Sequence, residues 1–201
     1  METHKNRKTI RLKNANYDGP GAVFLTICTK DRNCVLSNIF VGTGVPDGPF
    51  ARVDNTKEPS LYQPEDIVVK LKPYGLIAQG VIEQLNNFYA DISVISHVIM
   101  PNHIHLLIFL HPCEEVLIGQ RTEQGPSRTP VPTGLKNSKI SRFVSTFKRF
   151  CNKEFGKNMW QSRSYDHIIR NQQDYEEHIR YIYENPIRWH LDELYSQEDD
   201  N

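Results

Sequence analysis

The sequence has neither a long apolar run nor a patterned set of cysteines. No apolar stretch approaches the ~20 residues that a membrane-spanning helix needs, so we expect no membrane segment. The four cysteines, Cys28, Cys34, Cys113 and Cys151, are scattered and match no zinc or redox spacing. They are typical of free thiols in a reducing compartment. The charged N-terminus is not followed by an apolar segment, so we expect no secretory signal and a cytoplasmic protein.

The chain also lacks net charge, but its charges are unevenly distributed. Between residues 136 and 170, nine basic side chains stand against two acidic ones, and from residue 171 onward nine acids stand against two basic residues. A basic segment inside a neutral protein is either a phosphate-binding surface or a solvated helix face. The composition alone leaves both interpretations open.

The length of 201 residues suits one domain, which we take as residues 1–201. Two stretches, near residues 41–66 and 111–137, are rich in proline and glycine and interrupt any regular pattern. We interpret both as insertions in that domain.

Outside these insertions, seven segments have the periodicity of regular structure. Strands, rich in β-branched and apolar residues, are expected at residues 22–29, 91–100, 103–110 and 167–170. Amphipathic helices, with apolar residues at helical spacing, are expected at 73–88, 140–155 and 174–184. This order predicts an α+β fold, a ferredoxin-like sandwich with a mainly antiparallel sheet and helices on one face.

Two histidines one residue apart stand at the start of the third expected strand. Residues i and i+2 of a strand point to the same face, so His103 and His105 should project side by side, with Ile104 on the other face. Two converging imidazoles are half of a metal site. The alternative is a polar pair on a solvated face. The apolar flanks favour a central strand, where imidazoles without partners would be costly.

The stretch around this pair, VIMPNHIHLLI at residues 98–108, resembles the signature of the single-tyrosine HUH transposases. Within them it is most similar to the REP-associated, IS200-like tyrosine transposases. The segments WQ at residues 160–161, YDHIIRN at 165–171 and YIYENP at 181–186 resemble the same family. The resemblance spans roughly residues 22–29, 71–110 and 140–189.

The resemblance implies a transposase: a metal-dependent endonuclease and strand transferase for single-stranded DNA, acting through a 5′-phosphotyrosine intermediate. It maps the nucleophile onto Tyr181 and the metal ligands onto His103, His105 and Asn185. Tyr181 and Asn185 are four residues apart and so share a helix face. The better-known members carry glutamine where this chain has Asn185. The implied cofactor is Mg²⁺ or Mn²⁺, whereas imidazole ligands alone would favour manganese or zinc.

The implied partner is single-stranded or hairpin DNA of the REP type, with phosphates held by cations of the basic segment. Arg142, Lys148, Arg149 and Arg163 are the expected contacts. Some members of the family share active sites across a homodimer and others act alone, so both states are open.

Each assignment on the last helix has a rival. Tyr165, Tyr175 and Tyr183 are alternative nucleophiles, with Tyr165 the strongest because it precedes the last strand. Asn185 precedes a proline, so it can be an ordinary helix C-cap.

Two other functions compete with strand transfer. One is a metal-dependent hydrolase of another class, although Leu107 stands where a His-x-His-x-Asp site would need its acid. The other is a non-catalytic DNA- or RNA-binding module that keeps the fold. Loss of cleavage with retained DNA binding in a Tyr181→Phe variant would separate enzyme from binder.

Overall fold

A computed structural model describes residues 19–41, 51–52, 67–112 and 138–189. The insertions predicted at 41–66 and 111–137 lie largely outside these residues. The strands are β1 (Gly21–Cys28), β2 (Ser37–Val41), β3 (Ala51–Arg52), β4 (Ile67–Leu71), β5 (Ile92–Ile99), β6 (His103–Leu110) and β7 (Tyr165–Ile168). The helices are a short 3₁₀ turn (Lys30–Arg32), α1 (Pro73–Phe88), α2 (Lys139–Phe155) and α3 (Gln172–Glu184). Among the described residues, no helix has the length and apolar character needed to cross a bilayer.

The main sheet has the strand order β5-β6-β1-β7, and each neighbouring pair is antiparallel. Because β1 and β5 are joined through α1, and β6 and β7 through α2, this is the ferredoxin-like arrangement. The α+β fold class expected from the sequence is confirmed. β1 and β6 occupy the two central positions, in keeping with their apolar composition.

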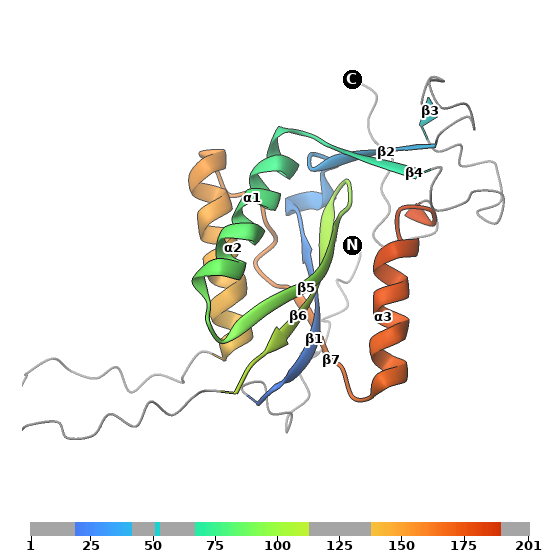
Figure 1. Ribbon diagram of the computed structural model, residues 1–201. Coiled ribbons are helices and arrows are strands. Elements are labelled where there is room, and N and C mark those ends of the chain that lie inside the picture. Colours follow the sequence, from blue (N-terminus) through green and yellow to red (C-terminus); the bar gives the residue numbers. More distant parts are fainter. Residues whose placement is uncertain (1–18, 42–50, 53–66, 113–137, 190–201) are drawn as a thin grey trace, which may run out of the picture.

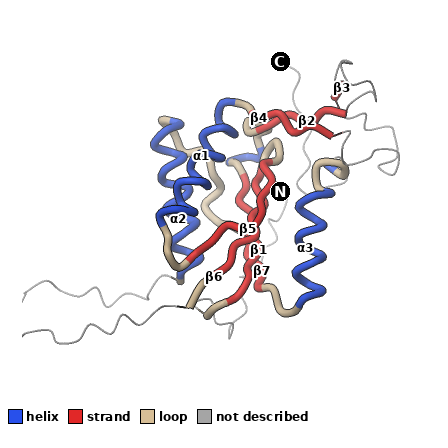
Figure 2. The backbone as a smooth tube through the Cα atoms, in the orientation of Figure 1, coloured by secondary structure: helices blue, strands red, loops and turns tan. Residues whose placement is uncertain are grey.

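The placement of the helices differs in part from the expectation. α1 and α2 cover one face of the sheet, and α3 covers the other (Figures 1 and 2). Alternate side chains of the central strands point to opposite faces of the sheet. Leu25 and Ile104 therefore join the core under α1 and α2. Phe24 and Leu107 pack with Ile182 of α3. The prediction of helices on one face is therefore wrong for α3.

A second, three-stranded sheet of order β3-β2-β4 was not expected from the sequence. It is joined to the main sheet through the segment that precedes β2. The backbone N–H of Leu36 donates to Pro101 O at 2.9 Å, and Ser37 Oγ donates to Ile99 O at 2.8 Å. These bonds tie the start of β2 to the turn that leads into His103.

Gly75, in the first turn of α1, lies against this same segment. A Cβ atom added there would stand 2.0 Å from the carbonyl oxygen of Leu36, whereas one added at Gly80 would meet nothing within 4 Å. We therefore expect Gly75→Ala to lower the free energy of unfolding by roughly 1–3 kcal/mol or more, as overpacking does. The matched Gly80→Ala should be neutral or stabilising by about 0.4–1 kcal/mol. Denaturant unfolding of the two variants checks this, and equal stabilities would contradict it.

Candidate active site

The two histidines of β6 face α3, on the side of the sheet away from α1 and α2. In the register with β1, His103 stands opposite Cys28 and His105 opposite Thr26. Ile104, between the histidines, points into the core on the other face. The predicted side-by-side projection is thus observed. It follows from the two-residue period of a strand whose other face is buried.

The two imidazoles converge at their outer nitrogens. The Nε2 atoms of His103 and His105 lie 2.9 Å apart, and the side chains are buried, at 0% and 2% exposure. Two ligand nitrogens at right angles on an octahedral metal with bonds of about 2.1 Å stand about 3.0 Å apart. The observed separation therefore suits one divalent ion bound by both rings.

Asn102 fixes which nitrogen of His103 carries the proton. The amide Nδ2 of Asn102 donates to the carbonyl oxygen of Arg32 at 3.2 Å, which leaves Oδ1 facing His103 Nδ1 at 2.8 Å. Because Oδ1 can only accept, Nδ1 of His103 must be the donor, and its Nε2 carries a lone pair. Burial, with a further contribution from the Arg32 charge, lowers the pKa of His103 to about 3. The ring is therefore neutral at physiological pH, the form in which an imidazole can bind a metal.

Thr26 gives His105 a more adaptable partner. Thr26 Oγ1 and His105 Nδ1 lie 2.9 Å apart in a buried hydrogen bond. A hydroxyl can donate or accept, so it supports either tautomer of His105. Without a metal, Nε2–H of His105 can donate to His103 Nε2. With Nδ1–H donating to Thr26 instead, both Nε2 lone pairs point at one position, where a cation would offset their repulsion.

α3 brings Tyr181 to this pair, and the segment after α3 brings Trp189. The Tyr181 ring lies 5.1 Å from the His105 ring, and the Trp189 ring lies 5.7 Å from the His103 ring, centroid to centroid. Asn185 lies four residues after Tyr181 and four residues before Trp189, and it is buried, at 3% exposure. Tyr181 is 43% exposed, so its phenol borders both the histidines and solvent.

The helix end at Asn185 agrees with the sequence in part. α3 ends at Glu184, as expected before Pro186, and Asn185 is its C-cap. Its backbone nevertheless stays helical, with φ −56° and ψ −43°, and its N–H donates to Tyr181 O at 2.9 Å. The C-cap role and a ligand role are therefore compatible. Metal binding by Asn185 stays a prediction.

The rival tyrosines are placed differently. Tyr183 is 71% exposed, and Tyr175 packs in the apolar cluster beneath α3. Tyr165 pairs with Thr26 across β1 and β7, so it stands on the site's side of the sheet but two strands away from His105. Of the described tyrosines, Tyr181 is the one whose ring contacts a histidine of the pair.

The basic residues of α2 are not brought to the histidines, because α2 covers the opposite face (Figure 1). Arg142 Nη2 forms an ion pair with Asp91 Oδ2 at 2.8 Å. Arg149 lies over the Phe150 ring at 5.3 Å and is exposed, as is Arg163. Their phosphate contacts stay predictions.

Lys148 is engaged with the chain itself. Its ammonium donates to the carbonyl oxygens of Gln161, Ser162 and Arg163, at 2.8, 3.4 and 3.2 Å. Burial lowers the pKa of Lys148, although the nearby Cys28 partly opposes the shift. The contacts fix the loop after Trp160 to α2, so a phosphate contact by Lys148 would have to exchange these carbonyls.

Four residues at the site were not found from the sequence. Asn102 lies inside the motif, but nothing in the sequence marks it as the hydrogen-bond partner of His103. Thr26 and Trp189 lie 79 and 84 positions from His105, so no local spacing marks them. Arg32, in the left-handed region with φ 58°, follows another such residue, Asp31, at φ 56°. Two consecutive non-glycine residues in this region are strained and often mark functional sites.

Comparison with known proteins adds independent findings. No known family profile matches the chain. An uncharacterized protein of Haemophilus influenzae is 28% identical over 195 residues, which covers 94% of this chain and 93% of that protein. The REP-associated tyrosine transposase of Escherichia coli K12 is 44% identical over 48 residues, 24% of this chain and 29% of that protein.

A solved structure of a REP-associated tyrosine transposase bound to a REP hairpin has a similar fold. The TM-score is 0.50 at 20% identity, over 90% of this chain and 74% of the other. The chain is therefore similar in fold, and over one 48-residue segment in sequence, to REP-associated tyrosine transposases. The histidine pair, Tyr181 and Asn185 are the residues to test first.

Proposed function

We propose that the chain is a metal-dependent transposase that cleaves and rejoins single-stranded DNA through a 5′-phosphotyrosine on Tyr181. The observation that carries the proposal is the contact of the Tyr181 ring with His105, whose Nε2 meets that of His103. A tyrosine hydroxyl beside two converging imidazoles suits metal-assisted phosphoryl transfer, in which the metal activates the phosphate that the nucleophile attacks.

His103, His105 and Asn185 would hold the metal, which we propose is Mg²⁺ or Mn²⁺. A bound divalent ion would supply Lewis-acid polarisation of the scissile phosphate. The chain's own residues then perform the transfer. Tyr181 Oη forms the bond to phosphorus, and the bond from phosphorus to the 3′ oxygen breaks. The phenol proton is lost and the departing 3′ oxygen becomes a hydroxyl, so the phosphodiester is conserved for rejoining.

We propose hairpin or single-stranded DNA as the substrate. The similar structure in complex with a REP hairpin supports this choice. Among the expected contacts, the exposed Arg149 and Arg163 are the more accessible to phosphate, since Arg142 and Lys148 have partners within the chain. Arg32, beside His103, is a further cation on the side of the sheet where Tyr181 lies.

The test is a denaturing gel of the protein incubated with end-labelled hairpin DNA and Mn²⁺. A labelled band that survives denaturation and is lost with EDTA supports the proposal. Free cleaved DNA without any adduct would indicate a hydrolase instead. Binding in a native gel with neither adduct nor cleavage would indicate a non-catalytic module.

We expect Asn102→Ala to raise the Mn²⁺ concentration needed for half-maximal adduct formation by about 10–100-fold, the usual effect of losing a ligand's hydrogen-bond partner. The reason is that His103 would no longer be held with its Nε2 lone pair toward the metal. Titration of Mn²⁺ in the gel assay measures this. Asn33→Ala, at an exposed asparagine in the adjacent loop, is the control. An unchanged metal titration for Asn102→Ala would contradict the positioning role.

A further inference from the structure

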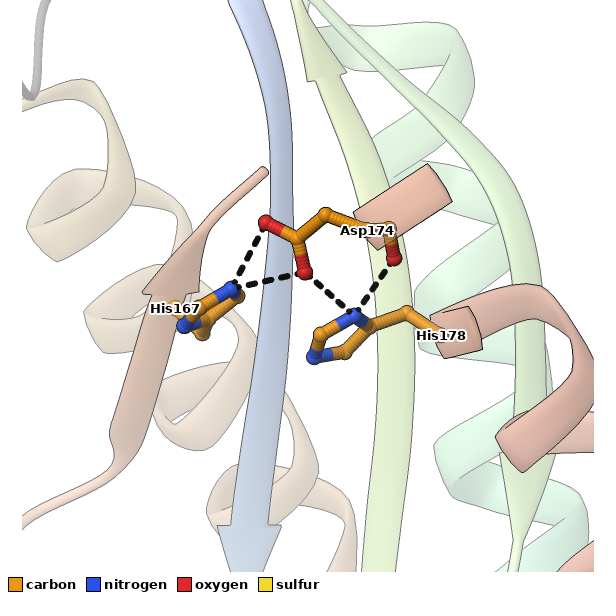
Figure 3. A group of neighbouring side chains, drawn as sticks. All are labelled: His167, Asp174 and His178. Atoms are coloured by element: carbon orange, nitrogen blue, oxygen red, sulfur yellow. Dashed lines mark hydrogen bonds and ion pairs between the residues drawn. The ribbon is translucent and has the colours of Figure 1, made fainter. Parts of the chain in front are cut away.

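A second group of side chains of metal-binding types lies where β7 passes into α3 (Figure 3). It shares no residue with the His103–His105 pair. His167 comes from β7, and Asp174 and His178 come from the first two turns of α3. His167 Nε2 lies 3.0 Å from both carboxylate oxygens of Asp174. His178 Nδ1 lies 3.1 Å from Asp174 Oδ1.

The donor set and its dimensions suit a transition metal. Two imidazoles and one carboxylate are ligands that zinc accepts, with bonds of about 2.0–2.2 Å, so tetrahedral neighbours stand about 3.3 Å apart. Ligand atoms of these three residues all lie within 4.8 Å of one another. The two rings are stacked, at 13° and 4.7 Å between centroids, so one of them would have to rotate to point its nitrogen at a shared ion. The side chains are 17–25% exposed, which leaves solvent access for a fourth ligand.

The surrounding backbone orients the carboxylate. Asp174 Oδ2 accepts a hydrogen bond from Arg170 N at 2.9 Å, and Asp174 N donates to Asn171 Oδ1 at 2.9 Å. Burial alone would raise the pKa of Asp174, but the bond from Arg170 and the neighbouring histidines lower it overall. The group is thus an anionic ligand at neutral pH, held by the outer hydrogen bonds typical of metal sites.

Metal binding by this group would require one hydrogen bond of His178 to break. His178 Nδ1 also lies 2.8 Å from the backbone carbonyl of Asp174, to which its N–H donates. A metal bound through this nitrogen would displace that proton, as imidazole coordination generally does. The carboxylate and His167 need no such exchange of backbone partners.

We propose that His167, Asp174 and His178 form a second metal site, for zinc, which fastens the start of α3 to β7. Its effect would reach the first site through Phe24. The Phe24 ring lies 4.7 Å from that of His178, 5.0 Å from that of His105 and 5.9 Å from that of Tyr181. An effect of zinc on the position of Tyr181 matters only if the proposed function holds. Zinc binding itself does not require strand transfer.

The test uses the full chain with both histidines of the first site replaced, His103→Ala/His105→Ala, dialysed against micromolar Zn²⁺. We expect one zinc ion per chain and, with Co²⁺ instead, the intense visible absorption of a tetrahedral site. The melting temperature should rise by about 5–10 °C at saturating metal. Absence of bound zinc, of the cobalt spectrum and of the shift would overturn the proposal, whatever the outcome for DNA cleavage.

His178→Gln and Asp174→Asn, each made in the double variant, should remove the bound ion while keeping most of the side-chain volume. The matched control is His97→Ala, since His97 lies in β5 near Glu83 of α1. If the double variant does not fold, the same substitutions in the wild-type chain should lower zinc content by one ion. Zinc retained in both His178→Gln and Asp174→Asn, or lost equally in the control, would assign the ion elsewhere and overturn the site.

Discussion

Replacing Tyr181 with phenylalanine is expected to remove the covalent adduct while leaving hairpin binding intact. The change deletes one oxygen from a side chain that is 43% exposed, and the ring keeps its contacts with Phe24 and His105. Folding should therefore survive, whereas the atom that would bond to phosphorus is gone. Loss of a covalent nucleophile lowers the rate by at least about 10³-fold. The denaturing gel measures the adduct, and a native gel measures binding.

Tyr183→Phe is the matched control, because Tyr183 lies on the same helix and is 71% exposed. This variant should form adduct normally. Tyr165→Phe tests the strongest rival. Peptide mapping of trapped adduct should find DNA on the peptide that carries Tyr181. DNA attached to Tyr165 or Tyr183 would move the nucleophile but keep the reaction. Normal adduct formation by Tyr181→Phe would show that the assignment of the last helix is wrong.

The double variant His103→Ala/His105→Ala is expected to lose metal-dependent adduct formation by about 10³-fold or more, since Lewis-acid stabilisation is worth several kcal/mol. The two rings supply both convergent nitrogens, so neither alanine can substitute for them. Excess Mn²⁺ should not restore the reaction. Adduct yield as a function of Mn²⁺ concentration measures the loss.

Because both rings are buried, circular dichroism and thermal melting must accompany this measurement. His105→Gln, which keeps polar atoms and most of the volume, provides a milder second variant and should also be defective. His97→Ala, on another strand, should retain activity. A folded double variant that forms adduct at the normal rate would refute the metal role of the pair.

The alternation of residues along β6 was sufficient to predict the geometry of the histidine pair. A strand has a period of two, so the parity of His103 and His105 determines that they share a face. The apolar residues of the other parity then determine which face is buried against α1 and α2. The spacing of four between Tyr181 and Asn185 fixed their shared helix face in the same local way.

The position of α3 was not predictable by the same reasoning. An amphipathic stripe shows that a helix packs against something, but not which face of a sheet receives it. A signal was nevertheless present, because β1 and β6 are apolar at both parities, as strands covered on both faces are. The β2–β3–β4 sheet has no clear signal in the sequence, because β2 and β4 flank, and β3 lies within, a stretch rich in proline and glycine.

The sequence by itself determined the local geometry of the site: two imidazoles on one strand face, and a phenol and an amide on one helix face. These follow from backbone periods that hold in any fold. Only the tertiary structure decided what those groups meet. It placed Thr26 beside His105 and Asp91 against Arg142. Such contacts join residues distant in the chain, and they are set by strand register and helix packing, which no short sequence pattern encodes.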